Sequence, residues 1–445
     1  MQKKNILMAY AFAMLTLVCL GIAYIVSMEH DAPEIIITPF PSSLTENSEL
    51  EVLLYDRSSG IKSVEISVII NGKPFPILTE SYAGKHNSRH LRFNLKHPAI
   101  TGKSGNIEGT LRIKATDHST ANWWNGNSSS LDAPFCIDAD PPQSELLGIS
   151  SQVRRGGSAA VAFRASEPLQ SALVRIGPHE FTAFEQTEQV YACIFAFPLE
   201  LPLEEFKPEL VLTDKAGNTS TSPLETAAVE HEYREDNIQI GQNFITGKFA
   251  EFSLIVPDEN DPLRLFLRMN RQVRQSNYAE LAEERHNTAA KPLWDNDFME
   301  LPNSVRRGLY GDRRVYINSG TTIDRQIHKG IDLASYRHDN VPAVSSGTVL
   351  MAGYLGIHGN MVLLDHGLGV QSLYSHLSRV GVAQGQQVTR GQTLGLTGTS
   401  GMAGGDHLHF EILVGGHSVE PDDWLNQPRR ARMETIINQP PNRRD

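Results

Sequence analysis

The sequence predicts a mainly β protein built from several domains. From residue 32 to about residue 230, short runs of β-branched and apolar residues alternate with turn-forming residues, which is typical of strands joined by tight turns. After residue 301, similar runs are punctuated by closely spaced glycines. The 445 residues are also too many for a single hydrophobic core, so we expect more than one domain.

An uncharged, mainly apolar segment from Ile6 to Ser27 lies close to the N-terminus. Its length suits a membrane-spanning helix, and Lys3 and Lys4 before it place the N-terminus in the cytoplasm. We expect residues 1–31 to be a cytoplasmic stub and transmembrane anchor. This predicts a single-pass protein of the cytoplasmic (inner) membrane whose bulk is periplasmic or extracellular. A cleaved signal peptide is the alternative, but no Ala-x-Ala-like site closes the run.

Two β-sandwich domains are predicted next, over residues 32–139 and 140–231. Turn motifs of the first region recur in the second at an offset of about 100 residues, the usual size of a sandwich. The stretch Thr213-Asp-Lys-Ala-Gly-Asn218 resembles a strand-to-turn signature of bacterial immunoglobulin-like domains. The resemblance implies spacers or binding modules, through which envelope proteins are conceivable partners, and it carries no catalytic residue.

Two cysteines fall in these regions. In an oxidising compartment Cys136 and Cys193 could pair, or both could be buried free thiols. The sequence does not distinguish the two because a disulfide depends on the distance between the two Cα atoms.

Residues 232–300 are predicted to connect the β-domains to the last domain. A helix is expected from Asp261 to Arg285, with Asp261 as N-cap and Pro262 in the first turn. It would brace the last domain or bind a partner. Residues 301–430 are expected to form a compact all-β domain, and residues 431–445 a disordered tail.

Histidine is concentrated in the all-β domain. Eight of the 16 histidines lie between His328 and His417. His328 and Asp332 are four residues apart, and His407 and His409 are two apart, so each pair shares one face of an extended chain. Two such strands would bring His328, Asp332 and either His407 or His409 around one ion.

This donor set predicts a catalytic zinc site with one Zn²⁺ per chain. Two imidazoles and one carboxylate leave a fourth position open for water, unlike the closed shell of a structural zinc site. Neutral imidazoles also suit proton transfer near pH 7. The remaining member of the His407/His409 pair and His376 are therefore the candidate catalytic groups. The formal net charge of -11 argues against a nucleic-acid partner.

Residues 301 to about 425 resemble the lysostaphin-type (LytM-like) zinc metallopeptidases, which cleave peptidoglycan peptides. The motifs that carry the resemblance are His328-Lys-Gly-Ile-Asp332, Gly359-Asn360 through Gly367, Leu373-Tyr-Ser-His376, Gly398-Thr-Ser-Gly401 and His407-Leu-His409-Phe-Glu411. The resemblance implies an all-β duplicated-hybrid-motif fold. It also implies that His328, Asp332 and His409 bind zinc, and that His376 and His407 act on the water and the developing oxyanion. Tyr336–Asn340 stand where the family has a shorter loop near the site. The resemblance therefore does not extend to the substrate specificity that this loop sets.

The function expected from these features is a membrane-anchored zinc metalloendopeptidase that hydrolyses peptide cross-links or stem peptides of peptidoglycan. A non-catalytic envelope scaffold, or an activator of another cell-wall hydrolase, is the alternative. A third possibility is autoinhibition, with residues 232–327 covering the substrate groove.

Overall fold

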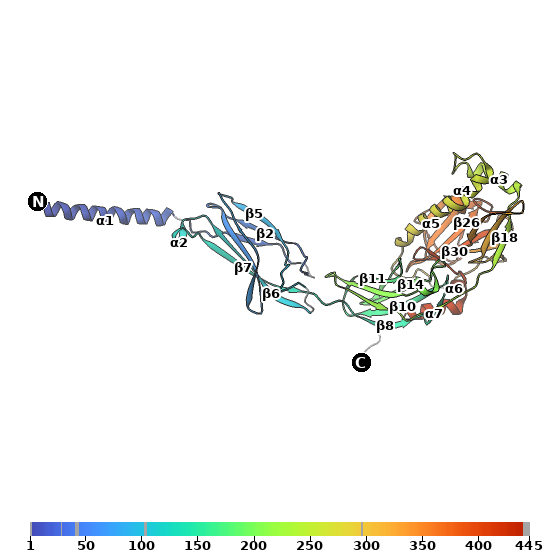
Figure 1. Ribbon diagram of the computed structural model, residues 1–445, viewed down its shortest axis with the longest axis horizontal. Coiled ribbons are helices and arrows are strands. Elements are labelled where there is room, and N and C mark those ends of the chain that lie inside the picture. The colour runs from blue at the N-terminus through green and yellow to red at the C-terminus, as the bar shows by residue number, and fades with distance from the viewer. Residues whose placement is uncertain (1, 28, 41–43, 102–104, 295–296, 439–445) are drawn as a thin grey trace. The chain divides into compact units, whose positions relative to one another are not determined.

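The computed structural model describes residues 2–27, 29–40, 44–101, 105–294 and 297–438. The fold is mainly β, as predicted (Figure 1). The chain divides into two compact units. One comprises residues 1–141 with the turn 215–218, and the other comprises residues 142–214 and 219–445.

The first unit contains two antiparallel sheets, with strand orders β1-β2-β5 and β4-β3-β6-β7, that enclose a shared apolar core. Buried and exposed residues alternate along β2 and β6, so one face of each strand points into this core. Its elements are α1 Gln2–Ser27, β1 Glu34–Ile37, β2 Leu50–Tyr55, β3 Ile61–Ile70, β4 Lys73–Ser81, β5 Ser88–Phe93, β6 Ile107–Asp117, α2 Ala121–Trp124 and β7 Ser128–Ile137.

The predicted single-pass membrane localisation has to be corrected. The apolar N-terminal segment does form a helix, α1. Within the described part of the chain, however, no helix combines the length and the apolar character needed to cross a membrane.

The second unit begins with two four-stranded sheets, ordered β13-β14-β10-β8 and β12-β11-β15-β16. Every residue of β14 is buried, as expected of a strand covered on both faces. The elements are β8 Ser144–Ile149, β9 Gln152–Arg154, β10 Ser158–Ala165, β11 Leu169–Ile176, β12 His179–Thr182, β13 Phe184–Thr187, β14 Val190–Ala196, η1 Leu203–Glu205, β15 Glu209–Asp214, β16 Thr219–Pro223 and β17 Ala227–Val229. Cys193 of β14 is buried and Cys136 is exposed, and both are free.

The connector is a strand followed by helices, and it confirms the predicted helix start. The Asp261 side chain accepts a hydrogen bond from the Arg264 amide at 2.8 Å, and Pro262 occupies the first turn. The elements are β18 Glu235–Gln239, α3 Gln242–Phe252, α4 Pro262–Arg268, the π-helical turn η2 Met269–Val273, α5 Arg274–Glu283 and η3 Glu284–His286. Leu281 of α5 packs against Leu363, Leu373 and Leu413, so this helix lies on the C-terminal sheet (Figure 1).

The C-terminal region is organised around an eight-stranded sheet, ordered β19-β22-β30-β26-β25-β24-β28, with β31 paired to β30. A second sheet, β18-β20-β21, joins the connector to this region. The elements are β19 Val305–Gly308, β20 Arg313–Asn318, β21 Thr321–Ile327, β22 Ile331–Ala334, β23 Asn340–Pro342, β24 Gly347–Leu355, η4 Gly356–His358, β25 Gly359–Asp365, β26 Val370–Leu377, β27 Arg379–Val380, β28 Gln387–Val388, β29 Thr393–Leu396, β30 Leu408–Val414, β31 His417–Val419, α6 Asp422–Leu425 and α7 Gln427–Ile437.

The tail predicted to be disordered from residue 431 is helical as far as Ile437. Met433 and Ile437 are four residues apart on α7, so both point to one side of the helix and are buried in the main core. Their burial explains the order of this segment. Residues 439–445, which the prediction also covered, lie outside the described residues.

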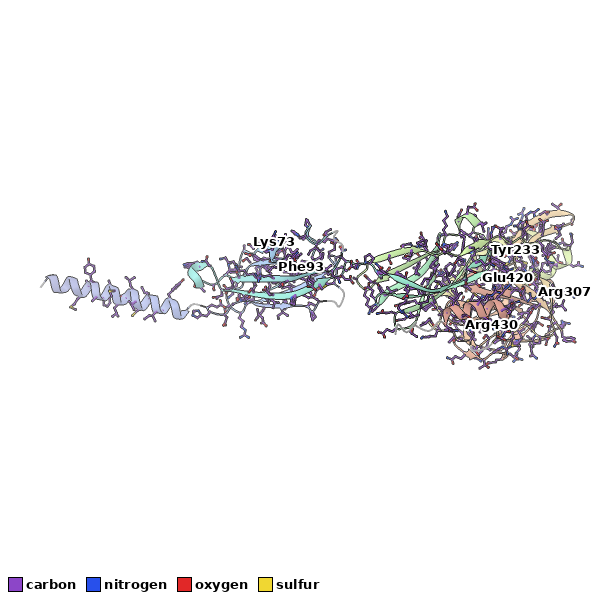
Figure 2. The ribbon with its side chains drawn as sticks, turned by 90° about the horizontal axis from the view of Figure 1, so that it is seen from below. Lys73, Phe93, Tyr233, Arg307, Glu420 and Arg430 are labelled. Atoms are coloured by element: carbon purple, nitrogen blue, oxygen red, sulfur yellow. The ribbon has the colours of Figure 1, made fainter. Side chains whose placement is uncertain are left out.

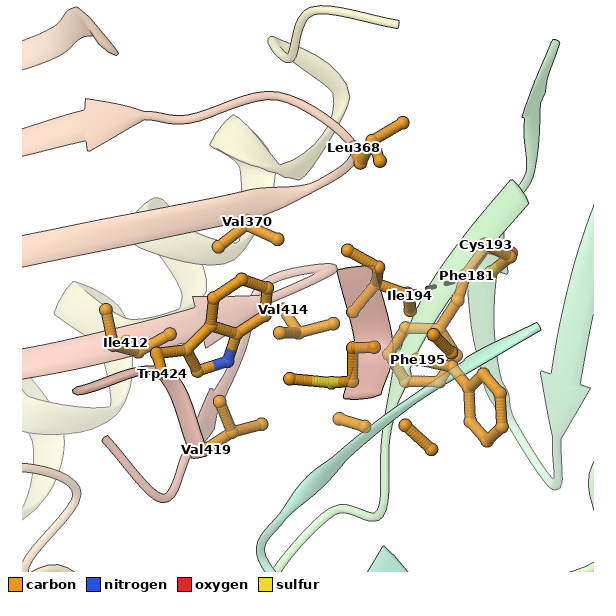
Figure 3. Close-up of a cluster of buried hydrophobic side chains, with 14 of the residues drawn as sticks. Phe181, Cys193, Ile194, Phe195, Leu368, Val370, Ile412, Val414, Val419 and Trp424 are labelled. Atoms are coloured by element: carbon orange, nitrogen blue, oxygen red, sulfur yellow. Dashed lines mark hydrogen bonds between the residues drawn. The ribbon is translucent and has the colours of Figure 1, made fainter. Parts of the chain in front are cut away.

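One hydrophobic core joins the second β-region to the C-terminal sheet. Figure 3 shows Ile194 and Phe195 of β14 on one side, and Val414 of β30 with Trp424 of α6 on the other. All four side chains are at most 2% exposed. Because apolar burial is the main stabilising term in folding, this shared core holds the two regions of the unit together.

A buried carboxyl lies at the same junction. The Glu420 amide donates to the Gly156 carbonyl at 2.7 Å, and the side chain lies near Tyr233 (Figure 2). Burial, with the nearby charges of Asp422 and Asp423, raises the pKa of Glu420 to about 7 from 4.5. An unfolded chain releases this proton at lower pH than the folded chain. The contribution of Glu420 to the free energy of unfolding is therefore fully present below about pH 4.5, and it is lost as the pH rises through about 7.

We expect Glu420→Gln to remove this pH dependence. The variant should be more stable than the parent at pH 8 by on the order of 1–3 kcal/mol and similar to it at pH 4.5. Urea unfolding at the two pH values, followed by tryptophan fluorescence, measures the difference. Glu232→Gln, which changes an exposed glutamate, is the control. Equal effects of the two substitutions at pH 8 would contradict the expectation.

Candidate metal centre

Three neighbouring segments bring the candidate ligands together. β22 pairs antiparallel with β30, and this register sets Asp332 directly opposite His409. His328 follows the last residue of β21, and its amide donates to the Asp312 carbonyl at 2.9 Å. Directly opposed residues in a sheet have close side chains on the same face, so pairing alone brings Asp332 and His409 together.

Gly330 lets the chain turn from His328 into β22 at very close range to β30. A Cβ atom at this position would lie 2.3 Å from the Phe410 carbonyl oxygen and 2.7 Å from the Glu411 Cγ atom. No side chain fits there. The glycine of the His-x-x-x-Asp motif is therefore required by the close packing of the two ligand-bearing segments.

The three ligand atoms form a small triangle. His328 Nε2 lies 3.1 Å from Asp332 Oδ1 and 3.0 Å from His409 Nδ1, and His409 Nδ1 lies 2.9 Å from Asp332 Oδ1. The three residues are between 4% and 8% exposed. They form one of the groups of side chains in the described residues whose spacing could hold a metal ion.

The other ring nitrogens have partners that fix their roles. His328 Nδ1 donates to the Leu309 carbonyl at 2.8 Å, and His409 Nε2 donates to Glu411 Oε1 at 2.8 Å. Without a metal, the Asp332 and Glu411 carboxylates outweigh burial and raise the pKa of His409 to about 9, so a proton lies within the triangle. When a cation displaces it and both rings are neutral, the lone pairs of His328 Nε2 and His409 Nδ1 converge with the Asp332 carboxylate. Three acceptors at this separation repel one another unless a proton or a cation lies between them. The donor set therefore fits a metal cation.

The charges around the triangle also favour a cation. Burial opposes ionisation of Asp332, but His328, His407 and His409 outweigh it and hold the pKa of Asp332 well below its usual range. Glu411 is fully buried, and the His409 imidazole and other donors lower its pKa to about 2 despite burial. Two ionised carboxylates thus flank His409, which is the arrangement that orients a metal-binding imidazole.

Arg314 of β20 provides a further contact to the centre. Its guanidinium forms an ion pair with Asp332 Oδ2, the carboxylate oxygen that faces away from the triangle. The arginine is largely buried in this position, with 18% of its side chain exposed. The contact holds the carboxylate in a fixed orientation, so that its Oδ1 atom points at the two imidazoles.

His376 and His407 lie beside the triangle. The His376 ring centroid is 5.0 Å from that of His407 and 5.7 Å from that of His409. His376 Nδ1 donates to the Ser400 carbonyl at 2.9 Å, and His407 Nδ1 donates to the Gly405 carbonyl at 2.8 Å. Each ring therefore keeps its Nε2 atom as an acceptor. His407 Nε2 lies 3.5 Å from Asp332 Oδ1.

The backbone and burial of His376 suit a base that is neutral at physiological pH. Its φ angle is 65°, a left-handed conformation at the end of β26 that turns the side chain out of the strand's regular alternation. Burial, followed by the neighbouring His407 and His409, lowers its pKa well below the ordinary value. The structure thus brings all five of the residues singled out from the sequence into one cluster.

Beside this cluster, a groove of about 650 Å³ runs between the connector and the Gly398–Gly404 loop. Glu251 of α3 accepts a hydrogen bond from the Gly401 amide, and Lys248 donates to the Thr399 carbonyl. His338, in the loop that departs from the family pattern, contributes to the lining. Connector residues therefore form one wall of this groove, and Leu377 and Ser400, which adjoin His376 in sequence and by a hydrogen bond, belong to its lining.

Sequence reasoning assigned no role to three residues around the centre. Glu411 could have been found, because it follows His407 and His409 at the same spacing of two and lies on the same face of β30. Arg314 belongs to the stretch Gly311-Asp-Arg-Arg, which also resembles the family, but its ion pair with Asp332 depends on the fold. Tyr278 could not have been found, since it contacts the site from a segment far away in sequence. Their roles appear only once the chain is folded.

Comparison with known proteins agrees with this geometry. Residues 326–421 match the model of Peptidase family M23. The C-terminal domain is a peptidase family M23 domain. The matched residues contain the three candidate ligands and both candidate catalytic histidines of this M23 domain, so the resemblance inferred from the motifs is confirmed.

Relatives of the M23 domain include hydrolases and an activator. Peptidoglycan DD-endopeptidase ShyA of Vibrio cholerae is 39% identical over 92 residues, 21% of each chain. Murein hydrolase activator EnvC of Escherichia coli is 36% identical over 99 residues, 22% of this chain and 24% of EnvC. The solved catalytic domain of lysostaphin from Staphylococcus simulans is 30% identical, covers 28% of this chain and 94% of its own, and has a TM-score of 0.25. The chain spans about a fifth of the length of the curated relatives that it matches.

Proposed function

We propose that this protein is a zinc-dependent endopeptidase that hydrolyses peptide cross-links or stem peptides of peptidoglycan. The observation that supports it is the joint placement of His328, Asp332 and His409 as a buried ligand triangle, with the Nε2 atoms of His376 and His407 beside it. A complete set of ligands and proton-transferring groups is what hydrolysis requires, and more than a structural metal needs.

In this proposal His328 Nε2, His409 Nδ1 and Asp332 Oδ1 hold one zinc ion. When bound, zinc supplies a Lewis acid that polarises the scissile carbonyl and lowers the pKa of water. His376 and His407 act on the attacking water and on the developing oxyanion. The Ser400 and Gly405 carbonyls fix each ring so that its Nε2 atom is available for that task.

The peptidoglycan substrate is proposed from the family. ShyA is a peptidoglycan DD-endopeptidase and EnvC is a murein hydrolase activator, so relatives of this domain act on the cell wall or on its hydrolases. We place the peptide in the groove between α3 and the Gly398–Gly404 loop, whose lining includes Ser400, the hydrogen-bond partner of His376. The two β-regions, proposed to be immunoglobulin-like modules, serve as spacers or contact the wall or envelope proteins.

Incubation of the full chain with purified cross-linked peptidoglycan tests the proposal. Mass analysis of the soluble products should reveal peptides with new amino and carboxyl ends. Chelation should stop the reaction and added zinc should restore it. No new peptide ends from the zinc-loaded protein, over a range of cross-link types, would overturn the hydrolase assignment.

A second candidate function is activation of another cell-wall hydrolase. The similarity to EnvC, a murein hydrolase activator, favours it. An activator would stimulate a purified amidase without cleaving peptides itself. It would also keep its effect in cells when Asp332 is changed to asparagine, whereas the endopeptidase would lose it.

A further inference from the structure

A connector residue contacts the metal centre from outside the M23 domain. The hydroxyl of Tyr278, on α5, donates to Glu411 Oε1 at 2.8 Å. The same oxygen accepts the hydrogen bond from His409 Nε2 at 2.8 Å, while Glu411 Oε2 accepts from the Ser418 hydroxyl at 2.6 Å. The fully buried Glu411 carboxylate is thus held by three donors, and one of them comes from the connector.

The Tyr278 ring also contacts the other side of the ligand set. The Lys329 ammonium lies 4.6 Å from the ring centroid, and Lys329 directly follows the ligand His328. The ring meets the buried His358 edge-on, with centroids 5.3 Å apart. One aromatic side chain therefore touches neighbours of two ligands that are far apart in sequence.

The preceding residue anchors the same helix to the domain. Asn277 is buried, and its Oδ1 atom accepts a hydrogen bond from the Ile357 amide at 2.9 Å. A Cβ atom on Gly356 would lie 2.3 Å from that oxygen, so the helix is seated closely on this turn. The Asn277 contact thereby fixes the part of α5 that carries Tyr278.

We propose that Tyr278 is a positioning residue of the metal centre, which acts through Glu411 to orient His409. This inference rests on the proposed zinc site. The phenol fixes one carboxylate oxygen, that oxygen fixes the tautomer and ring plane of His409, and His409 Nδ1 is then aimed at the metal. The connector is in this way a part of the site, although residues 232–300 lie outside the matched family region.

The chemistry of the contact supports this role. Burial and the Glu411 charge raise the pKa of Tyr278 well above its ordinary value, so the hydroxyl keeps its proton and donates at any physiological pH. Removing the hydroxyl leaves Oε1 of the fully buried Glu411 carboxylate with one donor fewer. The carboxylate can then rotate, and the preferred direction of the His409 lone pair is less well defined.

Zinc affinity of the full chain is the test, measured by competition with a chelator for Tyr278→Phe and for the matched control Tyr354→Phe. Tyr354 also donates to a glutamate, Glu251 at 2.9 Å, and within the described residues no hydrogen bond joins Tyr354 or Glu251 to the three ligands. We expect Tyr278→Phe to weaken zinc binding about 10–100-fold and Tyr354→Phe to change it less than twofold. Circular dichroism should show that both variants are folded.

Two further measurements separate positioning from a general structural role. With cobalt in place of zinc, the ligand-field absorption should shift in Tyr278→Phe and not in Tyr354→Phe. In addition, the double variant Tyr278→Phe/Glu411→Gln should bind zinc no more weakly than Glu411→Gln alone. Wild-type zinc affinity in Tyr278→Phe would overturn only the role proposed for Tyr278. Absence of zinc binding by the parent chain would overturn the proposed zinc site itself.

Discussion

His376→Ala is expected to lower the rate of peptide hydrolysis by about 10²–10⁴-fold, the usual contribution of a positioned acid or base. Zinc affinity should be unchanged, because His376 is not part of the ligand triangle and its Nδ1 atom is bound to the Ser400 carbonyl. The measurement pairs product release from cross-linked muropeptides with a chelator competition. The two readouts together distinguish a catalytic group from a ligand.

Controls make the His376 result specific. His286→Ala removes an exposed histidine of the same unit and should leave hydrolysis unchanged. His376→Gln keeps a polar side chain at the left-handed backbone position and should be as inactive as the alanine variant, since an amide does not transfer the proton. Hydrolysis at the parental rate would remove His376 from the mechanism, and loss of zinc would reassign it to metal binding.

The sequence was most informative where chemistry and local geometry coincide. His328 with Asp332, and His407 with His409, are close in sequence, and strand periodicity predicted that each pair shares one face. In the structure His328 follows β21 and Asp332 lies in β22, so a turn at Gly330 brings that pair together. The structure adds the register between β22 and β30, which sets Asp332 opposite His409. Glycine at position 330 also follows from this pairing, since β30 leaves no room for a side chain.

What the sequence could not reveal depends on long-range packing. Tyr278 has no local motif, and the stretch Gly311-Asp-Arg-Arg314 does not show what Arg314 contacts. Both contacts arise because α5 and β20 are folded against the domain. The polar composition after Arg430 suggested disorder, although Met433 and Ile437 are enough to bury one side of a helix. A few buried residues outweigh average composition when they share a face.

Asp332→Asn is expected to cause the greatest loss of zinc, at least about 100-fold in affinity, and with it the loss of hydrolysis. Asparagine preserves the size of the side chain and removes its charge. The ligand set then has no anionic member, because both other ligands are imidazoles. The buried guanidinium of Arg314 is left facing a neutral amide. Metal content by elemental analysis, with chelator competition, measures the effect.

Asp324→Asn is the matched control for this substitution. Asp324 is also a buried aspartate paired with an arginine, since its carboxylate accepts from Arg271 at 3.0 Å and from Asn270 at 2.8 Å. Losing that ion pair should lower stability and leave the metal in place, because the carboxylate is outside the triangle. If Asp332→Asn kept parental zinc affinity while folded, Asp332 would not be a ligand, and the chemistry proposed for this centre would lose its anionic donor.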